Sequence, residues 1–131
     1  MSTYTIPHLI MAIGRHNPND RLGDCVVRML VTLTGVDYDD IVEWLTTNYN
    51  YNDKTGVVWE RVLSENNNNI LGKQFIPVKF HGSVAQFVSE YKYDNYCVAV
   101  NRHVFVASFG KIVDAGYIKD GRRVKFVWRV E

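Results

Sequence analysis

The segment Gly23-Asp24-Cys25-Val26-Val27-Arg28-Met29-Leu30 predicts the start of an α-helix. Asp24 is the expected N-cap, and Gly35 is the expected stop. Apolar side chains surround this helix on nearly every side, which predicts a helix in the centre of the core, with Arg28 and Thr32 as its one polar stripe. The cysteine of the segment lies in the first turn, where the positive end of the helix dipole stabilises a thiolate, the reactive form of the side chain.

Three further helices are predicted, over residues 37–47, 57–65 and 83–91. The second helix has Asp37 as its N-cap and acidic residues in its first turn, and the fourth begins after Ser83, another capping residue. The i, i+3, i+4 spacing that marks a buried helix face is found in the second helix at Ile41, Trp44 and Leu45.

In the second half of the chain the hydrophobic pattern changes from that of helices to that of strands, and the sequence becomes rich in valine and aromatic residues. Pro77 makes the first predicted strand an edge strand or an irregular one. Helices followed by antiparallel strands predict an α+β fold, and a length of 131 residues predicts a single domain over 1–131. The predicted strands span residues 75–80, 96–100, 104–108, 112–113 and 124–130.

The formal net charge is only +1, which argues against a nucleic-acid partner bound through bulk electrostatics. Basic residues nevertheless gather near the C-terminus. They have two interpretations: the solvated face of an edge strand, or a basic docking patch. These residues are Lys119, Arg122, Arg123, Lys125 and Arg129.

Two cysteines are too few for a disulfide framework in a chain of this length, and Cys97 lies in an apolar run that predicts a core position. With no secretory signal and no apolar run of roughly 20 residues, the sequence predicts a cytoplasmic protein that does not span a membrane. No cofactor-binding motif is present, and no metal site is expected, because the cysteines and histidines lack ligand spacing. The histidines are His8, His16, His81 and His103.

The segment Asn101-Arg102-His103-Val104-Phe105-Val106 places a histidine at the head of an apolar strand, and Asp114 follows on the next short strand. Thiol catalysis needs a nucleophile, a proton carrier, a group that orients that carrier and donors for an oxyanion. Cys25, His103 and Asp114 are the candidates for the first three roles. The candidate donors are the backbone N–H of Cys25 and the side-chain amide of Asn19, with Asn17 in reserve.

This order of cysteine, histidine and aspartate resembles the papain-like cysteine peptidase superfamily, and most closely its compact bacterial and phage branch. Asp24-Cys25 is similar to the opening of the leader peptidases that mature bacteriocins, and the segments 103–107 and 112–114 are similar to their histidine and aspartate strands. The resemblance covers roughly residues 17–35 and 96–116. It implies a papain-like fold, a Cys-His-Asp triad and hydrolysis of a peptide, isopeptide or other amide bond, as in a cysteine peptidase or amidase. The same triad also serves deamidation and acyl transfer, and the sequence does not separate these reactions.

Two positions depart from that family pattern. Asn19 stands where glutamine is usual, and Val26 follows the nucleophile where glycine or another small residue is common. The alternative is therefore an inactive module on the same fold that binds or inhibits a host protein. The asparagine- and tyrosine-rich composition resembles that of a phage gene product, which implies a host partner and the host cytoplasm.

The turn between the predicted strand that begins at His103 and the one that carries Asp114 decides whether these two side chains can meet. A two-residue turn at Gly110-Lys111 would pair His103 with Ile118, which leaves Asp114 four residues away and out of reach. A loop over residues 108–111 would pair His103 with Gly116. Asp114 is then a diagonal neighbour at about 7–8 Å, which side chains can bridge. The triad therefore predicts the second register, with a wider turn or a bulge. Without it, Asn101 or a backbone carbonyl would orient His103 instead.

Overall fold

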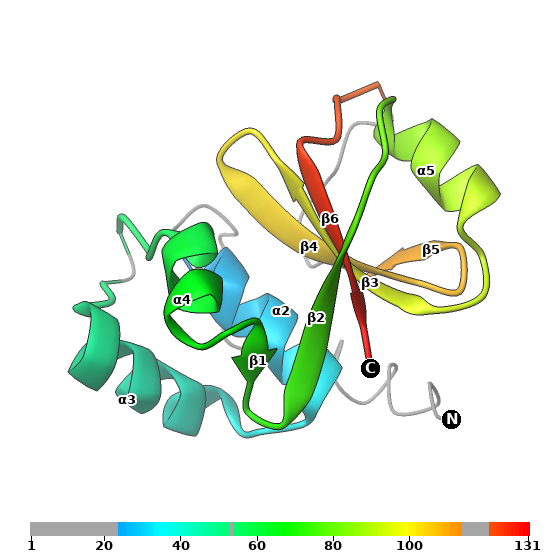
Figure 1. Ribbon diagram of the computed structural model, residues 1–131. Helices are drawn as coiled ribbons and strands as arrows, with labels where there is room; N and C mark the ends of the chain where they lie inside the picture. Colours follow the sequence, from blue (N-terminus) through cyan, green and yellow to red (C-terminus); the bar gives the residue numbers. More distant parts are fainter. Residues whose placement is uncertain (1–23, 53, 114–120) are drawn as a thin grey trace.

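The computed structural model describes residues 24–52, 54–113 and 121–131, and these form four helices and six strands (Figure 1). The helices and antiparallel strands confirm the α+β class. No helix among the described residues is long and apolar enough to cross a membrane. The elements are α2 (Cys25–Thr34), α3 (Tyr38–Tyr49), α4 (Trp59–Glu65), α5 (Val84–Glu90), β1 (Asn69–Ile70), β2 (Lys73–Val78), β3 (Asn95–Val100), β4 (His103–Ser108), β5 (Lys111–Val113) and β6 (Phe126–Val130).

Helix α2 is the predicted central helix, and every residue from Val26 to Thr32 is buried. Gly35 ends it as predicted, because its φ of 74° allows its N–H to bond the carbonyl of Val31. Arg28 and Thr32, expected as a polar stripe, are each only 3% exposed. The Thr32 hydroxyl donates a hydrogen bond to the carbonyl of Arg28 at 2.9 Å. The helix therefore has no solvent-facing side over these two turns.

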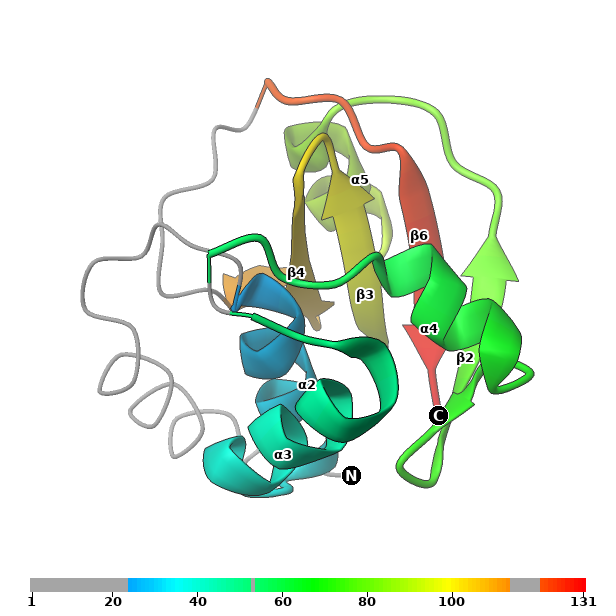
Figure 2. The ribbon, with the colours of Figure 1, turned by 90° about the vertical axis from the view of Figure 1, so that its left-hand side faces the viewer.

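The strands form one antiparallel sheet in the order β1-β2-β6-β3-β4-β5. Successive side chains of a strand point to opposite faces, so each strand contributes to two cores. Cys97, Ala99, Val104 and Val106 face the core shared with α2, α3 and α4, whereas the residues between them face the core shared with α5. Figures 1 and 2 show the three helices on one side of the sheet and α5 on the other.

The position of β6 corrects one interpretation of the basic residues near the C-terminus. That interpretation placed them on the solvated face of an edge strand, but β6 lies inside the sheet, between β2 and β3. Its apolar residues Val127, Trp128 and Val130 are buried. The sequence could not predict this placement, because a strand's neighbours depend on topology. Pro77 lies beyond the two residues of β2 that β1 pairs, which agrees with the predicted edge position.

Helices α3 and α5 confirm their predicted caps, and the bounds of α3, α4 and α5 shift slightly. The Asp37 carboxylate accepts from the N–H of Asp39, and Ser83 and Gln86 form a reciprocal capping box at the start of α5. Helix α4 begins at Trp59, two residues later than expected, because Val57 and Val58 belong to an extended segment. The fold therefore follows local signals at the helix starts.

The β4–β5 turn has the register that the triad requires. Ser108 pairs with Lys111 and Val106 with Val113, so the two strands are joined by Phe109 and Gly110 alone. Both turn residues have positive φ, 50° and 81°, as in a type I′ hairpin. The register equals that of the predicted 108–111 loop, although the turn itself is tighter.

A pair of variants tests this turn. Asparagine adopts positive φ readily, whereas a β-branched residue does not. We therefore expect Phe109→Asn to have a free energy of unfolding about 1 kcal/mol higher than that of Phe109→Val. Urea unfolding of the two variants measures the difference, and both lose the half-exposed ring of Phe109. Equal midpoints would contradict the positive-φ turn.

Candidate functional site

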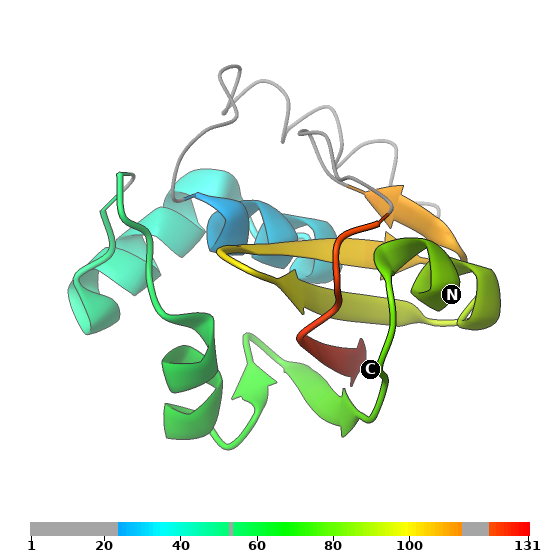
Figure 3. The ribbon, with the colours of Figure 1, turned by 90° about the horizontal axis from the view of Figure 1, so that it is seen from above.

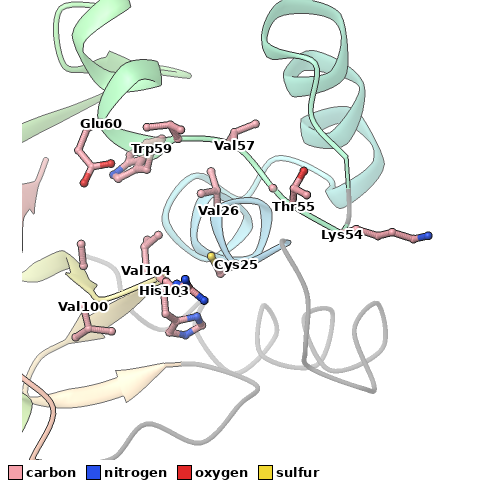
Figure 4. Close-up of a pocket in the computed structure, with 14 residues that line it drawn as sticks. Cys25, Val26, Lys54, Thr55, Val57, Trp59, Glu60, Val100, His103 and Val104 are labelled. Atoms are coloured by element: carbon pink, nitrogen blue, oxygen red, sulfur yellow. The ribbon is translucent and has the colours of Figure 1, made fainter.

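The candidate site is a cavity of about 770 Å³ at the start of α2 (Figure 4). This volume lies in the range of small-molecule and peptide side-chain pockets. One wall is the start of α2, a second is the extended segment before α4, and the third is the β3–β4 hairpin. The lining residues are Cys25, Val26, Lys54, Thr55, Gly56, Val57, Val58, Trp59, Glu60, Ala99, Val100, Arg102, His103 and Val104.

Cys25 is the first residue of α2 and is partly buried, with its sulfur at the wall of this cavity. The predicted position of a cysteine in the first turn of a buried helix is confirmed. The N–H groups of a first helical turn have no partner within the helix and carry partial positive charge, which favours a thiolate at this position.

His103 is the first residue of β4 and lines the same cavity. Ala99 and Val104 line it from the α2 side of the hairpin, whereas Val100 and His103 belong to the opposite side. The cavity therefore lies over the end of the hairpin and reaches both faces. The His103 ring stacks on Phe105 at a centroid distance of 6.1 Å and an interplanar angle of 21°, which restrains its orientation.

Two of the four predicted site residues, Cys25 and His103, line the same cavity, Cys25 from the start of α2 and His103 from the hairpin. The other two, Asp114 and Asn19, lie outside the described residues, as does the reserve donor Asn17. The described part of the β4–β5 hairpin nevertheless has the register that a His103–Asp114 contact requires.

Several lining residues were not predicted from the sequence. Trp59 is buried at the cavity wall, Glu60 follows it, and Lys54 contributes at the start of the extended segment. No local motif marks these three positions, because tertiary packing alone brings the segment to α2. Arg102 could have been found, since it precedes the candidate histidine in a hairpin turn, where its φ is 62°.

The carboxylate of Asp24 differs from its prediction. Asp24 holds the N-cap position, but its side chain makes no capping hydrogen bond to the described residues of α2. One oxygen accepts from Nε of Arg28 at 3.0 Å, and the other accepts from the Tyr38 hydroxyl at 2.8 Å. Both Asp24 and Arg28 are only 3% exposed. Arg28, one turn along the helix, therefore competes successfully for the capping carboxylate.

This buried network connects α2 to α3 directly beside Cys25. Burial, followed by the hydrogen bond and charge of Asp24, raises the pKa of the Tyr38 hydroxyl well above its ordinary range, so Tyr38 remains a donor. The guanidinium of Arg28 offsets the negative charge of the residue that precedes the cysteine. The network fixes the first turn of α2, and with it the position of the sulfur.

Cys97 is the second thiol, and it is fully buried in β3, which confirms its predicted core position. Burial raises the pKa of the Cys97 thiol well above its ordinary value, although the nearby Trp59 indole opposes the shift. Cys97 is therefore a protonated, enclosed thiol, in contrast to the thiol at the cavity.

Comparisons of this chain with models of protein families, with curated proteins and with solved structures found no match. Function is therefore inferred from the cavity itself. Within the described ranges, no cluster of three histidine, cysteine or acidic side chains could hold a metal ion.

The Asp24 network gives a stability prediction. Arg28→Met leaves a buried carboxylate without its guanidinium, and we expect a loss of about 3–5 kcal/mol in the free energy of unfolding. Tyr38→Phe removes a single hydrogen bond to that carboxylate and should cost about 2 kcal/mol. Arg61→Met is the control, because it breaks the solvent-exposed Arg61–Glu65 pair of the same i, i+4 spacing. Urea midpoints that fall equally for the two arginine variants would show that the buried network is unimportant.

Cys97 gives a pH prediction. Its thiol titrates at about pH 8.5–9 in the unfolded chain and well above that in the folded protein, so unfolding releases a proton at high pH. Stability should therefore fall by about 2 kcal/mol from pH 7 to pH 10 through this group alone. Denaturant midpoints measured over this range should fall less steeply in Cys97→Ala. An identical slope in the variant would contradict the assigned burial.

Proposed function

We propose that this chain is a small papain-like thiol hydrolase in which Cys25 is the nucleophile and His103 carries the proton. The observation that supports this proposal is that one cavity is lined by both side chains, although they come from a helix and a strand far apart in the sequence. A cysteine paired with a histidine at a helix start is the arrangement that activates thiol nucleophiles.

In this mechanism His103 takes the proton of Cys25, and Sγ attacks a substrate carbonyl carbon. A C–S bond forms, and the carbonyl π electrons move to the oxygen. The tetrahedral intermediate then expels the amine as the C–N bond breaks, and His103 returns the proton to that amine. Water adds to the thioester in the same way, with His103 taking its proton, and releases a carboxylic acid and the thiol.

Two further roles complete the site. Asp114 would orient the His103 ring, and the register of the β4–β5 hairpin supports this assignment. The backbone N–H of Cys25 at the start of α2 would donate to the oxyanion, together with the amide of Asn19. The Asp24–Arg28–Tyr38 network would keep this helix start in place.

The architecture supports a papain-like fold in the order of its parts. A buried helix carries the cysteine, an antiparallel sheet follows, and a strand of that sheet begins with the histidine. On this proposal the substrate is a peptide or protein. A phage origin, with a host protein as the target in the host cytoplasm, is the biological setting that the composition suggests.

Thiol reactivity tests the proposal without a known substrate. Iodoacetamide at pH 6 should alkylate Cys25 well ahead of Cys97, because a thiol held by an imidazole reacts as the thiolate. His103→Ala should slow the labelling of Cys25 by about tenfold or more. His81→Ala is the matched control, since His81 is an exposed histidine that does not line the cavity. Mass spectrometry of the labelled peptides measures both rates.

Each outcome separates the two function classes. Preferential labelling of Cys25 that depends on His103 but not on His81 supports the hydrolase. Slow labelling of both cysteines, unchanged by either histidine variant, would reject the hydrolase and favour the binding module on the same fold.

A further inference from the structure

The strand ends that lie beside the cavity, at one end of the sheet, carry many basic residues. β3 ends, β4 and β6 begin, and β2 ends here, as the antiparallel pairing requires. These strand ends lie at the top of the sheet in Figure 2, and Figure 3 looks down on them. Five cationic residues lie here, none buried, and we call them the basic edge: Lys79, Arg102, Arg122, Arg123 and Lys125.

The basic edge is continuous with the cavity. Arg102 lines the cavity, and Arg122 donates from its guanidinium to the carbonyl of Asn101, in the turn next to Arg102. The Lys125 N–H donates to the carbonyl of Ala99 at 2.8 Å, and Ala99 is itself a lining residue. The positive charges therefore begin at the catalytic opening and extend across β6 toward β2.

Acidic residues gather at the opposite end of the molecule. Asp94 precedes β3, Glu131 follows β6, and the first turn of α3 follows the far end of α2. Of the described acidic residues, Glu60 lines the cavity. Lys73, Lys92 and Lys111 also lie at that end, so its charges are mixed, whereas the strand ends beside the cavity are mainly basic.

One exposed aromatic ring adjoins the basic edge. Phe126 is 51% exposed, pairs with the lining residue Ala99 on the neighbouring strand, and stacks on Trp128 at 6.0 Å. An exposed apolar ring therefore lies beside the cationic side chains, next to a residue that lines the cavity.

We propose that the basic edge and Phe126 bind an acidic polypeptide segment and guide it to Cys25. This inference rests on the proposed function and names the substrate class of the same site. Charge complementarity supports it, because cationic residues beside a cleft raise the local concentration of anionic substrates. A polypeptide is favoured over single-stranded nucleic acid, because nucleic-acid grooves stack successive bases on several aromatic rings. Phe126 is the one exposed aromatic ring among the described residues of this edge.

Alkylating reagents of different charge test the basic edge directly. Iodoacetate is anionic and iodoacetamide is neutral, and both transfer a carbon to Sγ of Cys25 with loss of iodide. The triple variant Lys79→Gln, Arg123→Gln, Lys125→Gln removes three positive charges and none of the cavity lining. At about 0.1 M salt we expect it to lower the iodoacetate-to-iodoacetamide rate ratio about threefold.

The matched control removes three positive charges from the opposite end, as Lys73→Gln, Lys92→Gln, Lys111→Gln. Its ratio should remain that of the original protein, because six-residue strands separate these charges from the cavity by roughly 20 Å, about twice the screening length. Equal ratios in the original protein and both triple variants would overturn the proposal. Failure of iodoacetamide itself to react preferentially with Cys25 would instead reject the hydrolase, so the two failures are distinguishable.

Peptide protection tests the polypeptide. Hexaglutamate at millimolar concentration should slow iodoacetamide labelling of Cys25, and the basic-edge triple variant should weaken that protection. Hexalysine should give no protection. Protection by oligothymidylate but not by hexaglutamate would overturn the proposal in favour of nucleic acid, and the absence of protection by either would overturn it outright.

Discussion

The position of Cys25 depends on a helix that is buried on nearly every side. Helix α2 packs against β4 and α3, and its start lies with the end of the β3–β4 hairpin in the wall of one cavity. At that point the Asp24–Arg28–Tyr38 network replaces an ordinary cap. Buried ion pairs are expensive to form and expensive to break, which gives the first turn a single well-defined arrangement. The cavity, the thiol and the imidazole all depend on that constraint.

The two cysteines show how one residue type takes two chemical roles in the same core. Cys97 points from β3 into hydrocarbon and remains protonated, whereas Cys25 lies at the mouth of a cavity opposite a histidine. The difference arises from position: one thiol is in the middle of a buried strand, and the other is partly buried at the start of a helix, beside a cavity. The basic edge adjoins the cavity that Cys25 lines, because Arg102 belongs to both.

Local sequence signals predicted much of this structure, and tertiary packing and strand order determine the rest. Capping residues at Asp37 and Ser83 and the glycine stop at Gly35 located three helices within two residues. Asp24 holds the predicted N-cap position, but its carboxylate does not cap α2, because its partners include Tyr38 from the next helix. The edge position of β6 was wrong, because strand order is set by the whole sheet. Trp59 and Lys54 were missed for the same reason: the segment that carries them reaches the cavity only through packing.

The ionisation of the sulfur is the property on which the enzymatic interpretation depends, and ultraviolet absorbance of the thiolate measures it. Burial raises the pKa of Cys97, so any thiolate present at pH 6 belongs to Cys25. We expect a thiolate signal at pH 6 that disappears in Cys25→Ser and is strongly reduced in His103→Ala. A protein without thiolate absorbance at pH 6, or with a signal that His103→Ala leaves unchanged, would contradict a functional thiol–imidazole pair.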